Sequence, residues 1–183
     1  DVTMFVLQFY ALGRVDEAER HYRALIELNP SDNQGVRCLL LEALVRAGRD
    51  DEALALLRQY EDDAAAEWRF TWALIDFRQR RLEDAERRLA DALDYNPAVA
   101  LMVAATSAGP LPMPGPTVTL GGPDEAAGYA AAFGDAWRAV PGALEWLMST
   151  AVARVWKAPK ARGRPGASSR RGKAARKRRG GGK

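Results

Sequence analysis

Few residues of this chain have the type and spacing that chemistry requires. Its 183 residues include one histidine, His21, and one cysteine, Cys38. A tetrahedral zinc site needs several such ligands, and a nucleophilic site needs a serine or cysteine beside a base. His21 has neither nucleophile near it in sequence, so we interpret it as an exposed helix residue rather than a catalytic base. Cys38 precedes three leucines, which predicts a buried, unreactive thiol.

Two further patterns could bind charged groups. The segment LGGPDEAAG, around residues 121–122, precedes a helix start but lacks the lysine and hydroxyl residue of a phosphate-binding loop, so we interpret it as a turn. The acid pairs 50–51 and 62–63 lie at a helix start and in a connector, where we expect them to stabilise helix ends rather than bind a cation. The sequence therefore predicts no catalytic, cofactor-binding or metal-binding residue, and no enzyme.

Charge is distributed unevenly along the chain. Residues 157–183 contain 12 of the 27 basic residues and no acid, whereas the preceding residues carry 15 arginines against 24 acids, a formal net charge of −9. The basic segment also lacks large apolar side chains. It cannot bury enough surface to offset the entropy of ordering, so the sequence predicts a disordered tail over residues 158–183.

The composition of the basic tail indicates that it could bind nucleic acid. The word Arg162-Gly163-Arg164-Pro165 resembles the core of an AT-hook, whose arginines lie in a narrow minor groove. A polycation without sequence preference is the favoured alternative, because the word occurs once and Ala161 replaces the usual proline. Both interpretations pair the tail with phosphate. The candidate nucleic-acid-binding residues are Arg162, Gly163, Arg164, Pro165, Arg170, Arg171, Lys173, Arg176, Lys177, Arg178 and Arg179.

Three related segments between residues 13 and 97 predict the helical elements of the chain. They are GRVDEAERHYRALIELNP from residue 13, GRDDEALALLRQYEDDAA from residue 48 and RRLEDAERRLADALDYNP from residue 80. Their shared alanines, Ala18, Ala53 and Ala85, lie 35 and 32 residues apart, a period typical of helical-hairpin repeats. A methyl group fits where two antiparallel helices cross closely, and larger side chains four and seven positions later face the core.

These residues resemble the tetratricopeptide repeat family. The matching positions are Gly13, Ala18, Tyr22, Leu25 and Pro30, then Gly48, Ala53, Leu57 and Tyr60, then Ala73, Ala85, Leu89, Ala92 and Pro97. Ala65 stands where the family has proline, and Arg80 replaces the glycine that ends a helix in a left-handed conformation. The resemblance implies stacked helical hairpins that bind segments of other proteins.

A second resemblance extends towards the C-terminus. YNPAVALMV, a proline-rich connector, GGPDEAAGYAAAFGDAW and VPGALEWL are similar to the suppressor of tumorigenicity seven family and its soluble relatives, over roughly residues 28–148. That family is membrane-associated in animals, but this chain has no apolar run of the roughly 18–20 residues needed to span a bilayer. We expect a cytoplasmic protein, or a nuclear one if the host is eukaryotic and residues 170–179 act as an import signal.

The predicted fold is all-α. It consists of tetratricopeptide-like repeats over residues 1–107, with about three hairpins and the start of a further helix, and a Pro/Gly-rich connector over 108–122. A helix pair over 123–157 and the basic tail follow. Pro123 and Pro141 mark the two helix starts. Because the chain begins at Asp1 rather than methionine, we expect further residues upstream.

Binding is the function that this fold predicts, because the first helix of each hairpin lines a groove. The projected groove positions are Met4, Leu7 and Tyr10, then Leu39, Glu42 and Arg46, then Phe70, Leu74 and Arg78. Apolar anchors mixed with arginine suit an extended or helical segment that carries a few acids.

An alternative of equal weight is that the C-terminal helices of the chain itself cover this groove, with Trp137, Trp146 or Trp156 inserted. No lysine precedes Lys157, which excludes the lysine-dependent clamp that the family uses for chaperone C-termini. We therefore predict a non-catalytic adaptor that binds a protein or peptide and needs no cofactor. The alternative function is a nucleic-acid-binding protein that acts through its tail.

Overall fold

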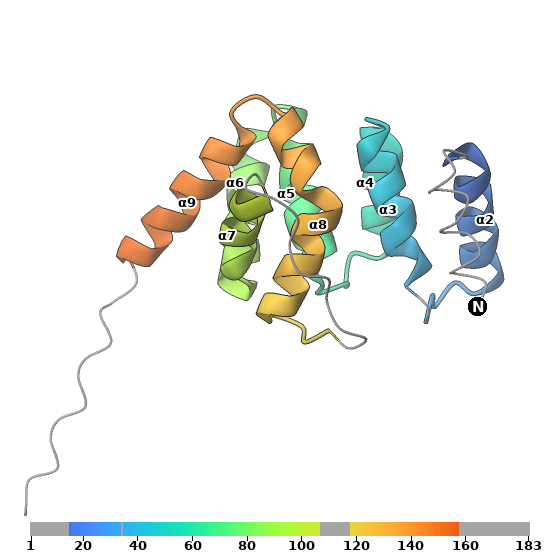
Figure 1. Ribbon diagram of the computed structural model, residues 1–183. Helices are drawn as coiled ribbons and strands as arrows, with labels where there is room; N and C mark the ends of the chain where they lie inside the picture. Colours follow the sequence, from blue (N-terminus) through green and yellow to red (C-terminus); the bar gives the residue numbers. More distant parts are fainter. Residues whose placement is uncertain (1–14, 34, 107–117, 158–183) are drawn as a thin grey trace, which may run out of the picture.

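The protein is helical throughout the residues that its computed structural model describes, which are 15–33, 35–106 and 118–157. Figure 1 shows the helices arranged side by side along the molecule. They are α2 (Val15–Leu28), α3 (Val36–Arg46), α4 (Asp50–Gln59), α5 (Ala66–Arg78), α6 (Leu82–Tyr95), α7 (Ala98–Ala105), α8 (Pro123–Ala139) and α9 (Ala143–Lys157). These ranges contain no strand, so the predicted all-α class is confirmed.

The repeated alanines lie where the hairpin helices pack. Ala18, Ala53 and Ala85 are all fully buried, as the period predicts. Helix α3 packs against α4, α5 packs against α6, and α2 packs against α3. Helix α2 therefore takes the place of the second helix in the first hairpin, whereas the projected positions Met4, Leu7 and Tyr10 lie outside the described residues.

Helix α3 ends in the conformation that its glycine predicts. Gly48 has φ of +70°. Its amide donates to the carbonyl of Val45 at 3.1 Å, and the amide of Arg49 donates to the carbonyl of Leu44 at 2.9 Å. This pair of hydrogen bonds satisfies the last carbonyls of the helix and turns the chain back towards α4.

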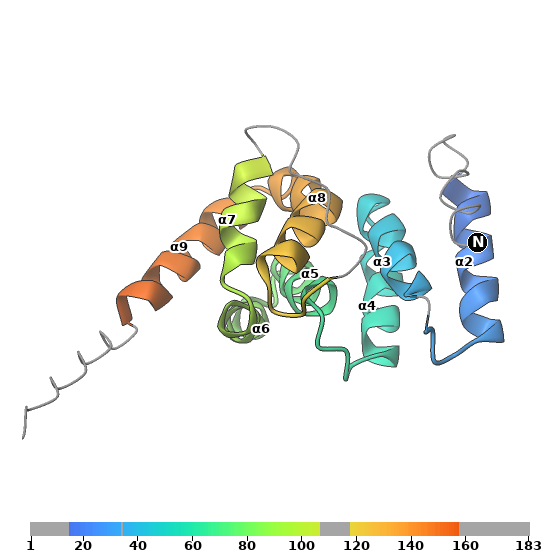
Figure 2. The ribbon, with the colours of Figure 1, turned by 60° about the horizontal axis from the view of Figure 1, so that its bottom comes forward.

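The last three helices do not continue the series of hairpins. Helix α7 packs against α8, and α8 also contacts α3 and α5, the first helices of two successive hairpins. We call the surface that α3 and α5 share the inner face. Figures 1 and 2 both show α8 lying along α5 and α7, and α9 packs against α6, α7 and α8. Helix α8 thus covers part of the inner face.

Candidate functional site

Helix α8 occupies the inner face through aromatic side chains on one of its sides. Tyr129, Phe133 and Trp137 recur every four residues and are at most 1% exposed. The rings of Tyr129 and Phe70 lie 5.5 Å apart, and the Trp137 indole donates a hydrogen bond to the Tyr129 hydroxyl at 2.9 Å. The inner face is therefore filled by the chain itself along the middle of α5.

This packing changes which predicted groove residues are accessible. Phe70 and Leu74 are fully buried in the core, so the picture of an open groove is wrong at these two positions. Leu39 and Glu42 are half-buried. Here the second interpretation of the sequence applies: a C-terminal helix of the chain itself, α8, covers the groove. Whether any of these residues binds a partner remains a prediction.

The predicted aromatic plug is two tryptophans rather than one. Trp137 is fully buried, and Trp146 is half-buried with its ring 6.0 Å from that of Trp137. Trp146 also stacks on Phe77 of α5, with ring centroids 4.6 Å apart. The side chain of Trp156 lies outside the described residues. The turn between α8 and α9 is thereby fixed against the end of α5.

A buried carboxylate fastens the start of α8. Glu125 is 2% exposed, and its Oε1 accepts hydrogen bonds from the amide of Ala66 at 3.1 Å and the hydroxyl of Tyr95 at 2.9 Å. Its Oε2 accepts from the side-chain amide of Asn96 at 2.9 Å and the amide of Gly121 at 2.8 Å. Burial, together with this hydrogen bond to Glu125, raises the pKa of Tyr95 to about 12. Glu125 thus joins α8 to the start of α5 and the end of α6.

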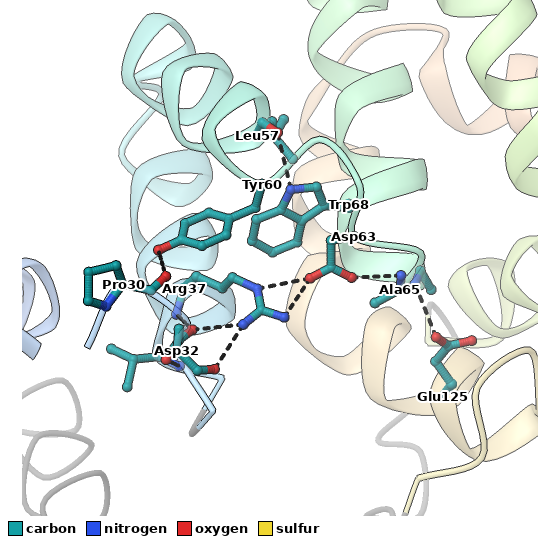
Figure 3. A network of polar contacts seen from close by, with 11 residues as sticks. Pro30, Asp32, Arg37, Leu57, Tyr60, Asp63, Ala65, Trp68 and Glu125 are labelled. Atoms are coloured by element: carbon teal, nitrogen blue, oxygen red, sulfur yellow. Dashed lines mark hydrogen bonds and ion pairs between the residues drawn. The ribbon is translucent and has the colours of Figure 1, made fainter. Parts of the chain in front are cut away.

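A second polar network holds the start of α3 against the connector between α4 and α5 (Figure 3). Arg37 donates from Nε to Asp63 at 2.9 Å and from Nη1 to the carbonyl of Asp32, also at 2.9 Å. The Asp32 carboxylate accepts the amide of Val36 at 2.8 Å. The Arg37 guanidinium lies over the ring of Tyr60, 5.4 Å from its centroid. Asp63, in the connector, therefore serves a structural ion pair with Arg37.

An open cleft remains at the C-terminal ends of α3 and α5. It has a volume of about 540 Å³, and the turn between α8 and α9 closes one side. Three arginines, Arg46, Arg78 and Arg80, and two acids, Asp50 and Asp135, line it, and we call it the basic cleft because the arginines are in excess. Two of the nine projected groove positions, Arg46 and Arg78, thus come together here. Phe77, Val140 and Pro141 supply apolar walls.

Two of these arginines are oriented by neighbouring acids. The Nη2 atom of Arg46 lies 2.9 Å from Glu42 and also donates to the carbonyl of Ala132 on α8 at 3.1 Å. The Nη1 atom of Arg78 lies 3.2 Å from Oδ1 of Asp50, a buried oxygen that accepts no hydrogen bond. Burial raises the pKa of the carboxyl groups of Glu42 and Asp50. Each guanidinium has five N–H donors, more than these contacts use.

The third arginine has an unusual backbone. Arg80 has φ of +61° and follows α5 as Gly48 follows α3. Its amide donates to the carbonyl of Phe77 at 3.1 Å, and the amide of Arg81 donates to the carbonyl of Asp76 at 2.9 Å. These hydrogen bonds repeat those at Gly48. A residue with a Cβ atom costs about 1 kcal/mol more than glycine in this conformation. The sequence shows this replacement but not that the left-handed turn persists.

The residues whose types could serve catalysis or ligand binding lie in ordinary helix and turn positions. His21 is exposed on α2, and Gly121 has φ of +74° in the predicted turn. Cys38 is half-buried, less than the sequence predicts, and burial with the nearby Glu67 carboxylate raises the pKa of its thiol to about 12. Within the described part of the chain, no three His, Cys, Asp or Glu residues form a group that could hold a metal ion. The tail positions from Arg162 to Arg179 lie outside the described residues.

The comparisons with known proteins agree with the repeat architecture. Residues 9–70 match the family model of the tetratricopeptide repeat, a range that includes α2, α3, α4 and the start of α5. No curated protein and no solved structure gives a significant match to the chain. The all-α fold is consistent with this match to a tetratricopeptide-like helical repeat over residues 9–70, and repeats of this kind generally mediate contacts between proteins. None of the described helices has the length and apolar character to cross a membrane.

Proposed function

We propose that the protein is a non-catalytic scaffold that binds an acid-bearing segment of another protein at the basic cleft. The observation that carries this proposal is the convergence of Arg46 and Arg78, from successive hairpins, on one open cleft. Guanidinium groups pair with carboxylates through two parallel hydrogen bonds, so a cleft with several arginines suits a segment with several acids.

The cleft is open to a partner while α8 stays on the inner face. A segment bound at Phe70 and Leu74 would displace Tyr129, Phe133 and Trp137 from their buried positions. Exposing each of these rings costs about 1.5–3 kcal/mol, and the partner would have to offset the sum. Binding at the open end requires no such displacement.

Partner capture by the full chain tests this proposal. The variant Arg46→Glu plus Arg78→Glu reverses two charges in the cleft, whereas Arg58→Glu plus Arg87→Glu reverses two exposed charges on α4 and α6. We expect the first variant to lose the partners that the second retains. Circular dichroism must show helical content unchanged; otherwise Arg46→Gln plus Arg78→Gln replaces the charge reversal. Equal recovery by both folded variants would rule out the cleft.

The basic tail supports a second candidate function, binding of nucleic acid, because residues 157–183 contain 12 basic residues and no acid. The repeats would then position a basic arm. A cytoplasmic location, a nuclear one in a eukaryotic host, and kinship with the suppressor of tumorigenicity seven family remain predictions of the sequence.

A further inference from the structure

We propose that Arg80 determines the specificity of the basic cleft, and that its ligand is the carboxylate of an Asp or Glu side chain within the bound segment. This inference rests on the proposed function and adds to it the residue that selects the partner. Arg80 lines the same cleft as Arg46 and Arg78. It belongs to the turn after α5, so the helix-face projection that identifies the other two arginines does not include it.

The pairing of the neighbouring arginines sets Arg80 apart. Arg78 lies 3.2 Å from Asp50, and Arg81 donates from Nε to Asp76 at 2.9 Å. Arg80 is exposed and makes no ion pair with any residue that the structure describes. Its guanidinium therefore needs no rearrangement of the fold before it binds an incoming carboxylate with two parallel hydrogen bonds.

The backbone gives a second, independent reason. The same turn after α3 uses Gly48, the residue type that this conformation favours. An arginine at φ of +61° makes the turn less stable than glycine would. Residues held in unfavourable backbone conformations occur preferentially at binding sites, where the side chain serves a function other than stability. Arg80 thus provides a guanidinium at a position where glycine would make the fold more stable.

The walls of the cleft define the rest of the ligand. Phe77, held by its stacking on Trp146, lies beside the three arginines together with Val140 and Pro141. Apolar walls next to arginine suit an apolar side chain adjacent to an acid. Arg80 takes one carboxylate, and Arg46 and Arg78 have more N–H donors than their contacts with Glu42 and Asp50 use, so the cleft suits a segment with more than one acid. The expected ligand is a linear segment with two or more acids beside an apolar residue.

The test is a selection from a library of random displayed heptapeptides on the immobilised full chain. Wild type, Arg80→Gly, Arg80→Lys and the control Arg58→Ala are compared under the same salt conditions. Because all four chains carry the same basic tail, peptides that bind the tail are recovered equally. Beyond the peptides common to all four chains, we expect wild type and Arg58→Ala to enrich peptides with acids beside an apolar residue, and Arg80→Gly to lose this additional enrichment.

The affinity of one enriched peptide gives the quantitative result. Arg80→Gly should weaken it about tenfold or more, and Arg80→Lys should weaken it less because lysine keeps the charge but not the planar fork. The same Arg80→Gly variant should melt about 2–4 °C higher, because it relieves the backbone strain. Loss of binding therefore cannot be attributed to unfolding.

Three outcomes would overturn the inference. They are equal affinity for wild type and Arg80→Gly, enrichment that does not depend on acids, and a lower melting temperature for Arg80→Gly. The proposed function fails separately, if Arg46→Glu plus Arg78→Glu leaves peptide and partner binding intact. If Arg80→Gly loses peptide binding while Arg46→Glu plus Arg78→Glu keeps it, the site is the turn after α5 alone.

Discussion

At the scale of single residues, Glu125 shows how much of the fold depends on one buried charge. Four neutral donors satisfy its carboxylate: two main-chain amides, the Tyr95 hydroxyl and the Asn96 amide. The sequence predicts an acid at a helix start, and α8 does begin at Pro123. It could not predict the burial, because Tyr95 and Asn96 precede Glu125 by 30 and 29 residues.

Replacing this carboxylate should therefore be costly. In Glu125→Gln one acceptor oxygen becomes an NH₂ group that faces other donors, so two hydrogen bonds are lost in a buried site. We expect the free energy of unfolding to fall by about 2–3 kcal/mol in urea denaturation. Glu145→Gln, at an exposed position in the first turn of α9, is the control and should change it by less than about 0.5 kcal/mol. Equal effects would show that Glu125 is not fixed as described.

Cys38 offers a prediction about pH. Its thiol has a pKa of about 12 in the folded chain against 9.0 in the unfolded chain. The folded state holds the proton more tightly, so this contribution to stability is complete below pH 9 and is lost as the pH rises towards 12. The slope from this group is at most about 1.4 kcal/mol per pH unit.

Two measurements check this behaviour. Native protein at pH 8 should react with a thiol reagent far more slowly than the denatured chain, and as the only cysteine it gives an unambiguous signal. Between pH 9 and pH 11, the stability of Cys38→Ala should fall less steeply than that of wild type. Rapid labelling of the native thiol at pH 8 would contradict the effect of burial.

At the scale of elements, the sequence predicts features that depend on a local pattern, but not those that depend on contacts between distant segments. The hairpin helices follow from a period that buries Ala18, Ala53 and Ala85, because each pattern acts within its own segment. The position of α8 on α3 and α5 does not follow, since nothing in its own periodicity says which surface its apolar side covers. The same limit explains why the helix phase projects Phe70 and Leu74 onto an open groove although both are buried.

If α8 is part of the core, removing one anchor should destabilise the whole fold. Trp137→Ala removes a fully buried indole and its hydrogen bond to Tyr129, so we expect a loss of about 3–5 kcal/mol. Trp146→Ala removes a half-buried ring from the same cluster and should cost less. Thermal and urea unfolding of both variants measure the difference. A mild effect of Trp137→Ala, or the reverse order, would instead indicate that α8 is loosely held and that the inner face can open.

At the scale of the whole molecule, the two charged regions have opposite signs. The residues before 157 carry a formal net charge of −9, and the residues from 157 onward carry 12 basic groups. Both sites proposed here, the tail and the basic cleft, have anionic ligands, so binding of an anionic partner does not by itself identify the site. Salt dependence separates them, because a long polycation releases many counterions from a nucleic acid, whereas a cleft with three arginines forms few contacts.

The isolated segment from Lys157 to Lys183 tests whether the tail binds nucleic acid. On duplex DNA, its affinity should fall with salt with a logarithmic slope of several units, since each phosphate contact contributes about −0.9. Replacing Arg162 and Arg164 with lysine keeps the charge but removes the planar groups that suit a narrow minor groove. An AT-hook would lose its preference for A·T sequences while keeping the slope, whereas a plain polycation would give the same profile for both peptides. Weak binding with a slope near zero would exclude the tail and leave the basic cleft as the only binding site proposed for this chain.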